Sequence, residues 1–433
     1  MMNFRIDTEW DTHRDAEDID VARMSFVADD QLLTHLIDHE TQTNRKFFET
    51  SALSLSFWFA DNWWRLRHET LGDLRYPSVE WRLRHELSAA SGGTLWPPMM
   101  IYGVGDRVTL AMAPNYRQAA GPTRYLDFAP VAVDGRDYEA GLDLFFERVV
   151  AECGSHPDGA PLRHLLDQLK RERGDRDVAA WRILEACLGF DPDEAPDRVI
   201  ETMAAFEDRL GEEAVEEAAV AAPGRESPEL LEAAIAASEA SSIIVDFSDV
   251  NRIDPRHRML PRSVPWRLAE NAARQLHDRL GKPGHLAGHC FTDLLRIRGE
   301  DFRRAAATAR DLPYAARLAD GHRNQLAMQM EPERLRRFEA ARMVGDEIWS
   351  QQSRFGVVSR SKSDRQKFQR AFAKALLCPF PELRRHVDLD RPSREQITAA
   401  ADHFDVDRTV VRAILVDKGY LETPSFEDML EAA

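Results

Sequence analysis

Cysteine is scarce in this chain, and its spacing excludes several kinds of site. The sequence has 433 residues and four cysteines, none of which forms a Cys-x-x-Cys pair. We therefore expect neither a disulfide framework nor a cysteine-rich zinc site, as is usual in a reducing compartment. The cysteines are Cys153, Cys187, Cys290 and Cys378.

Long apolar runs are also missing. The most apolar stretch, residues 51–64, is interrupted by Asp61 and Asn62 before it reaches membrane-spanning length. Residues 1–18 are acidic and lack the apolar core of a secretory signal. The common phosphate-binding, dinucleotide-binding and serine-hydrolase motifs are absent as well. We expect a cytoplasmic protein that does not enter the membrane.

Charge is abundant but unevenly distributed. The net charge is -17. Residues 254–420 hold 32 Lys and Arg against 22 Asp and Glu, whereas residues 1–253 hold 25 against 48. The basic part could meet nucleic acid or an acidic partner. Alternatively, the two parts of the chain could attract each other.

Residues 1–155 are rich in tryptophan and predict an α+β domain. Six of the nine tryptophans fall within the first 96 residues, and the sequence WRLRHE occurs at 64–69 and again at 81–86. Strands are expected at 21–28, 99–104 and 107–113, and a strand leading into a helix at 47–69. Clustered Trp and Arg side chains are typical of interfaces, although Trp more often builds a core. The candidate interface comprises Trp63, Trp64, Arg65, Arg67, Trp81, Arg84 and Trp96.

Residues 156–222 differ from the first block. Their apolar residues recur every three or four positions, which predicts a small, acidic helical domain. A linker is expected at 222–229, and a third domain at 230–433 with its core at 266–420. We expect this last domain to be mostly helical, with a strand at 241–250 and one edge strand at 323–330.

A set of short motifs in the third domain has a recognisable order. A strand is followed by Arg337-Phe338 opening a helix, by Phe372-Ala373 and Leu376-Leu377 in a helix that ends at Pro379, and by a helical pair around Phe404 and Val406. This order resembles the ImmA/IrrE metallopeptidases. The resemblance covers about 266–420 and implies a zincin-like fold within an overall α+β chain.

Active members of that family carry His-Glu-x-x-His on the first of these helices. Residues four apart share a helix face, so both imidazoles reach one zinc ion and the glutamate acts on the bound water. The corresponding positions here begin with Arg342 and Met343 and end with Asp346. The family's third ligand is an acid just before Phe-Ala, where this chain has Gln366 and Phe368. The resemblance therefore implies a scaffold without the zinc chemistry, and we expect no cofactor.

Two further features suggest alternative functions. His285 and His289 are four residues apart, as in a zinc helix, but glycines and Pro283 around them favour a helix entrance. The helical pair at 397–404 and 408–421 also matches a DNA-binding helix-turn-helix unit, with Arg408 and Arg412 as candidate phosphate or base contacts.

These observations favour a non-catalytic regulatory or protein-binding protein. The resemblance implies stress response, mobile-element control or phage defence as settings, and a helix-turn-helix repressor as the partner. The first alternative is a DNA-binding transcriptional regulator that uses the C-terminal helix pair. The second is an active metal-dependent peptidase with a non-standard site.

Overall fold

The computed structural model describes most of the chain as two compact units. The first comprises Met1–Ala204 with Pro223–Arg225 and Ser361–Ser363, and the second comprises Ala205–Ala222, Glu226–Arg360 and Asp364–Ala433. Both combine helices with antiparallel strand pairs, so the expected mixture of helix and strand is confirmed. The described residues are 3–10, 19–71, 77–90, 95–113, 123–257, 259, 264–281, 284, 286, 288–351 and 353–422.

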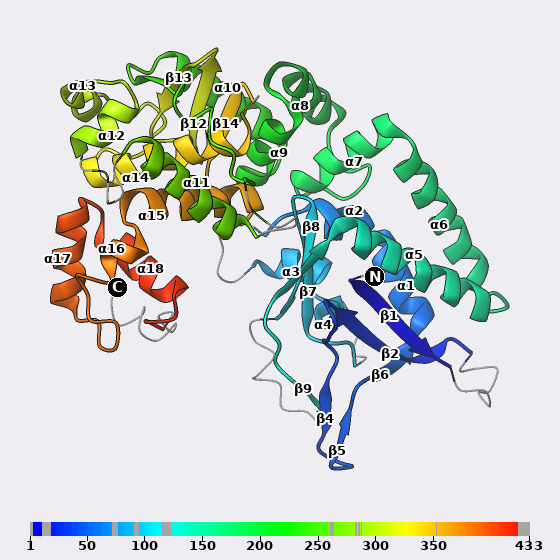
Figure 1. Cartoon of the computed structure of the whole chain (residues 1–433). Coiled ribbons are helices and arrows are strands. Elements are labelled where there is room, and N and C mark those ends of the chain that lie inside the picture. Colours follow the sequence, from blue (N-terminus) through cyan, green and yellow to red (C-terminus); the bar gives the residue numbers. More distant parts are fainter. Residues whose placement is uncertain are drawn as a thin grey trace. The chain divides into compact units, whose positions relative to one another are not determined.

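The first unit contains three small sheets (Figure 1). In the largest sheet, β2 pairs with β1, β3 and β6; a second sheet has the order β10-β8-β7, and a third the order β5-β4-β9. The strands predicted at 21–28, 99–104 and 107–113 are present as β2, β7 and β8. The strand bounds are β1 Phe4–Glu9, β2 Val21–Ala28, β3 Gln31–Leu32, β4 Leu36–Asp38, β5 Thr43–Arg45, β6 Phe48–Ser51, β7 Met99–Val104, β8 Arg107–Met112, β9 Thr123–Tyr125 and β10 Val131–Asp134.

Helices pack against the first two of these sheets and share one large buried core with them. Helix α5 lies against β1 so closely that a Cβ at Gly141 would be 2.6 Å from the Phe4 carbonyl oxygen. Next to it, the rings of Phe4 and Tyr138 have centroids 5.0 Å apart. The helix bounds are α1 Ala52–Asp61, α2 Trp63–His68, α3 Val79–His85, α4 Leu87–Ala90, α5 Gly135–Glu152, α6 Gly159–Gly174, α7 Arg176–Cys187 and α8 Asp197–Leu210.

Residues 156–222, expected as a separate helical domain, are divided between the two units. The helices themselves are present. Leu162 and Leu169 of α6 and Ala186 of α7 belong to the same buried cluster as the strands of the first unit. Helix α9 belongs to the second unit. Apolar periodicity therefore located the helices but not the core that each one joins.

The second unit is built on a four-stranded sheet of order β11-β13-β12-β14. The predicted strand within 241–250 is confirmed as β11. The predicted edge position of the strand at 323–330 is wrong, because β13 lies between β11 and β12. Strands β12 and β14 were not expected. The strands are β11 Ile244–Asp246, β12 Ala315–Asp320, β13 Arg323–Ala327 and β14 Phe355–Val358.

Helices α14 and α15 form the centre of this unit. A Cβ at Gly345 of α14 would lie 3.0 Å from the ring of Phe372 on α15, so the two helices approach closely. Ala341, Val344 and Ile348 line the buried stripe of α14. The helices are α9 Glu212–Ala221, α10 Ser227–Glu239, α11 Pro265–Arg279, α12 Gly288–Leu294, α13 Gly299–Arg304, α14 Glu333–Trp349, α15 Asp364–Leu377, α16 Phe380–Leu383, α17 Arg394–Phe404 and α18 Arg408–Asp417.

Candidate functional site

The positions predicted to have lost their metal ligands lie together in the second unit. Arg342 and Asp346 lie one turn apart on α14, and Gln366 lies on the neighbouring helix α15. The Arg342 guanidinium donates to the Gln366 side-chain oxygen over 2.8 Å. Two neighbouring positions on α14 and one position 20 residues further along the chain therefore lie near one another between the two helices.

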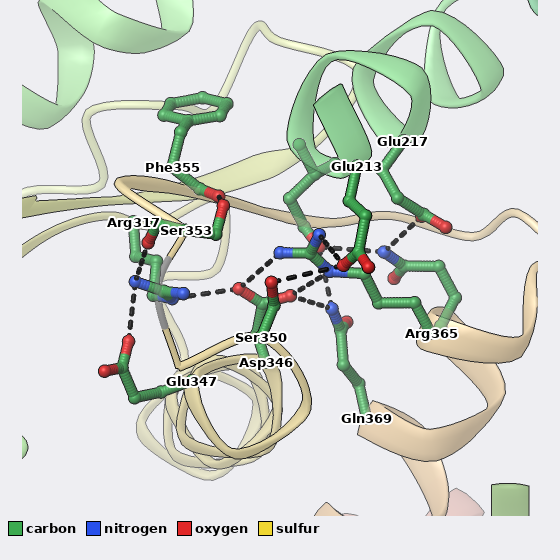
Figure 2. Close-up of polar contacts among 12 residues, drawn as sticks. Glu213, Glu217, Arg317, Asp346, Glu347, Ser350, Ser353, Phe355, Arg365 and Gln369 are labelled. Carbon is green, nitrogen blue, oxygen red and sulfur yellow. Dashed lines mark hydrogen bonds and ion pairs between the residues drawn. The ribbon is translucent and has the colours of Figure 1, made fainter. Parts of the chain in front are cut away.

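Asp346 is the centre of a buried ion-pair network (Figure 2). Its carboxylate accepts from Arg317 Nε at 2.9 Å and from Arg365 at 2.7 and 3.0 Å, on opposite sides. Gln369 Nε2 donates to the same carboxylate at 2.7 Å. Asp346 and Arg317 are 0% exposed. The carboxylate thus has four charge-assisted or amide hydrogen bonds, which leaves it no orbital for a metal ion.

The network balances its charges within the protein. Arg317 Nη1 also lies 2.7 Å from Glu347, so two arginines face two carboxylates. Burial raises the pKa of Asp346, but Arg365 and Arg317 outweigh it and hold that pKa below its ordinary value. Burial raises the pKa of Glu347, and the nearby Arg317 offsets this effect only in part, so the pKa stays above its ordinary value.

Gln366 also uses its whole hydrogen-bonding capacity. Its Nε2 donates to Glu217 of α9 at 3.0 Å and to the Val357 carbonyl at 2.8 Å. Its Oε1 accepts from the Ser359 amide at 3.0 Å and from Arg342. An amide has two donors and two acceptor positions, so all four are occupied.

Arg342 does not pair with Asp346 across the helical turn, although the spacing allowed it. Its guanidinium donates to the Ser359 carbonyl at 2.5 Å as well as to Gln366. Burial lowers the pKa of Arg342, and the nearby Arg370 adds to that effect. A guanidinium keeps its proton in proteins and has no lone pair for a metal.

The other two predicted positions belong to the apolar core. Met343 and Phe368 are fully buried. The Phe368 ring stacks on Phe372 with centroids 6.2 Å apart and packs on Trp349 at 5.2 Å. Both positions therefore stabilise the α14–α15 interface.

No alternative metal centre is found among the described residues, since none of their His, Cys, Asp and Glu side chains form a group of three or more able to hold an ion. His289 lies in the first turn of α12, is exposed, and has its Nε2 3.2 Å from the sulfur of Cys290. His285, its predicted companion, lies outside the described residues.

The candidate tryptophan interface is largely interior. Trp63, Trp64 and Trp96 are 3%, 5% and 7% exposed and belong to the core of the first unit. Trp81 is half-buried and packs beside Tyr102. Three of these four indoles therefore stabilise the fold and offer little surface to a partner.

The repeated sequence WRLRHE forms the same local structure twice. In both copies the tryptophan stacks on the histidine four residues later, and the next arginine pairs with the glutamate that follows the helix. The stacked pairs are Trp64–His68 and Trp81–His85, and the ion pairs are Arg65–Glu69 and Arg82–Glu86. The repeat is therefore a structural unit of helices α2 and α3, whereas the sequence left open whether its Trp and Arg side chains form an interface or a core.

The two copies meet through a buried histidine. His85 Nε2 lies 3.1 Å from Glu69, and its Nδ1 lies 2.8 Å from the Ile101 carbonyl oxygen. Burial raises the pKa of Glu69, but His85 and Arg65 outweigh it, so the net effect is a lowered pKa. His85 is 0% exposed, which keeps it from any substrate.

The remaining arginines of the candidate interface also have intramolecular partners. Arg67 donates to Glu139 at 2.8 Å, and Arg84 lies 3.7 Å from Asp191. Arg65 pairs with Asp191 as well, and is 2% exposed.

The C-terminal helical pair is present as expected. Helix α17 has a capping box at Ser393 and ends at Phe404, and Asp405, with a φ of 50°, begins a three-residue turn into α18. Phe404 and Val406 are buried between the helices. Arg408 is exposed and Arg412 is half-buried.

A groove that sequence reasoning did not locate lies between α11, α15, α16 and α18. Its volume is about 710 Å³. Small residues of α11 and α15 leave the space open, and lysines and arginines of both helices line it. Sequence spacing could have predicted that these residues share one face of each helix, but not that the helices pack side by side.

Comparisons with known proteins give no assignment: no protein-family model, curated protein or solved structure matches this chain. In the part of the chain that the structure describes, every helix is too short or too polar to cross a membrane.

Proposed function

We propose that the second unit is a degenerate ImmA/IrrE-like scaffold and that the chain is a non-catalytic, protein-binding regulator. The observation that carries this proposal is the ion-pair network around Asp346. A position that would hold a histidine ligand in an active enzyme instead neutralises two buried arginines, Arg317 and Arg365. A carboxylate in that role stabilises the fold and activates no water.

The convergence of the former ligand positions supports the scaffold part of the proposal. Arg342, Asp346 and Gln366 come from two adjacent helices, as three ligands of one zinc ion would. Each is replaced by a side chain that serves a hydrogen bond or an ion pair. The partner that the resemblance implies is a helix-turn-helix repressor, bound without cleavage.

Two measurements on the purified full chain test this proposal. Elemental analysis should find far less than one equivalent of zinc per chain, because the Asp346 carboxylate already accepts four hydrogen bonds. Affinity-tagged chain should retain its partner intact, with the partner's full mass by mass spectrometry. One tightly bound metal per chain, or a partner recovered as defined fragments, would favour the non-standard peptidase instead.

Direct DNA binding is the second candidate, and the α17–α18 pair is the observation that favours it. The exposed Arg408 begins α18, but Asp407 caps that helix and Asp402 lies on the helix before it. These carboxylates repel phosphate. Steeply salt-dependent duplex binding that is lost in Arg408→Ala/Arg412→Ala would establish this function in place of the first.

A further inference from the structure

We propose that residues 423–433 form a short amphipathic helix whose apolar face covers the groove between α11, α15, α16 and α18. The contact is intramolecular, so it holds or fails independently of the proposed partner-binding function. Described residues of all four helices line this groove, whose volume is about 710 Å³. A groove between helices is a common site for the apolar face of a further helix.

The groove presents apolar surface that the described residues leave uncovered. Ala273 of α11 and Ala371 and Ala375 of α15 line it, and none of these positions places a large side chain in the space. Trp266, at the start of α11, also lines the groove and is 50% exposed, although most large apolar residues described in this unit are buried. Covering such a surface lowers the free energy, because apolar area leaves water.

The described part of the chain ends at the edge of this groove. Lys418, directly after α18, lines the groove and lies 2.7 Å from Glu270 of α11. Two residues later, the ring of Tyr420 stacks on Phe380, another lining residue, with centroids 5.8 Å apart. The structure describes the chain as far as Glu422. Residues 423–433 are therefore tethered beside the groove, which gives them a high effective concentration there.

The sequence of these eleven residues has the pattern of an amphipathic helix. Its larger apolar residues and the last alanine recur at i, i+3, i+4 and i+7, which places them on one helical face. They are Phe426, Met429, Leu430 and Ala433. The three acids of the segment fall on the opposite face, and Thr-Pro-Ser at its beginning is typical of a helix start. One face therefore matches the apolar groove and the other matches solvent.

The length of the segment also suits the groove. A helix over 426–433 is about 12 Å long at about 1.5 Å per residue, and the stretch of α11 from Trp266 to Asp278 that lines the groove is about 18 Å long by the same rise. Residues 421–425 remain as the connection from α18. A helix this short is marginal in water by itself. We therefore expect it to form together with its contact in the groove.

Thiol labelling of the full chain tests this contact. Ala371→Cys introduces a thiol on the groove floor, and the four native cysteines are buried. Its reaction with N-ethylmaleimide is followed by mass spectrometry of the peptide that contains position 371. Adding Phe426→Ser/Leu430→Ser should raise the labelling rate at least about tenfold, because the apolar contact that holds the segment on the groove is removed. Equal rates with and without these two substitutions would overturn the proposal. Ala375→Cys, one turn further along α15, provides a second reporter in the same groove and should give the same result.

Matched variants show whether the apolar face makes the contact. Ala237→Cys, half-buried on α10 outside the groove, should react at the same rate with either form of the segment, which shows that the faster labelling at position 371 is local. Glu427→Gln/Glu431→Gln changes only the polar face and should leave the labelling at position 371 slow. An equal acceleration by the glutamine and the serine substitutions would contradict the proposal.

The dependence on chain concentration identifies which copy supplies the segment. Protection by the chain's own residues 423–433 does not change on dilution, because the contact is intramolecular. Protection that is lost on dilution would mean that a second copy of the chain covers the groove, and would overturn the intramolecular contact.

Discussion

Asp346 lies between two buried guanidinium groups, and a neutral side chain of the same size cannot replace its negative charge. In Asp346→Asn the side chain keeps its size but presents an NH₂ donor to Arg317 and Arg365, which are themselves only donors. Removing one member of a buried ion-pair network typically costs about 3–5 kcal/mol. We therefore expect a clear loss of stability, measured as the free energy of unfolding in urea.

The matched control is Glu300→Gln, which removes a carboxylate 61% exposed to solvent and paired with Arg304. Exposed pairs contribute about 0–1 kcal/mol, so this variant should unfold almost as the wild type does. The pKa of Asp346 is held below its ordinary value. Its contribution is therefore present at neutral pH and lost as the pH falls through that lowered value. A wild-type chain no more stable than Asp346→Asn at pH 7 would contradict the ion-pair account.

Gly356 of β14 leaves room for the Asp346–Arg317 ion pair to lie directly against this strand. A Cβ at this position would overlap the Asp346 carboxylate and lie 2.7 Å from Arg317 Nε. Neither group can move aside without breaking a buried ion pair, so Gly356→Ala should cost about 1–3 kcal/mol. Gly174→Ala, where a Cβ meets nothing within 4 Å, is the control and should not destabilise the chain. Comparable unfolding midpoints for the two variants would rule out the crowding.

Among the elements, α9 concentrates negative charge on one helix. Burial raises the pKa of Glu216 to about 8, with further contributions from Glu212, Glu207, Glu217 and Glu213. A raised carboxyl pKa means that the folded chain favours the protonated form. The contribution of protonated Glu216 to stability is fully present below the ordinary pKa of a glutamate and is lost as the pH rises towards 8.

Glu216→Gln should remove this pH dependence. We expect the variant to melt at a higher temperature than the wild type at pH 8, by about 2–4 °C for each kcal/mol recovered, and at nearly the same temperature at pH 5. Glu232→Gln, on the exposed face of α10, is the control. A stabilisation that is the same at both pH values, or equal in the control, would show that α9 is not the cause.

Elements with strong periodicity were predictable from the sequence, and the site was predictable only in part. The helix containing Arg342 and Asp346 follows from its apolar spacing. The partner of Asp346 does not, because Arg317 lies 29 residues away on β12, a strand with no clear alternation. The alternation of residues along 323–330 favoured an edge strand. Asn324 is in fact buried and accepts from Arg317 over 3.1 Å. On these two strands, buried polar side chains that pair over long distances in sequence replace the alternation of apolar and polar residues by which a strand is recognised.

At the scale of the whole molecule, the unit boundaries differ from those of the expected domains. The linker expected at 222–229 follows α9, yet α9 belongs to the second unit. Glu217 accepts from Gln366, and Glu213 lies 3.2 Å from the Ser350 hydroxyl. The Leu210 carbonyl accepts from Ser353. A helix placed before the linker therefore completes the hydrogen bonding of the site.

Two fragments of the chain test that assignment. A fragment of residues 205–433 contains α9 and all of the site. A fragment of residues 230–433 lacks α9, so Gln366 loses its Glu217 partner and the apolar face of α9 no longer covers β14. A buried group left without its partner costs about 1–3 kcal/mol, and the uncovered apolar surface adds to that cost. We therefore expect the longer fragment to unfold in one cooperative transition and the shorter one to melt at a markedly lower temperature or to aggregate.

The measurement is thermal unfolding by circular dichroism, with Glu217→Gln in the longer fragment as a control that keeps α9 and changes only the acceptor. If both fragments melt at the same temperature, α9 is not part of the second unit and the boundary near residue 230 is the correct one.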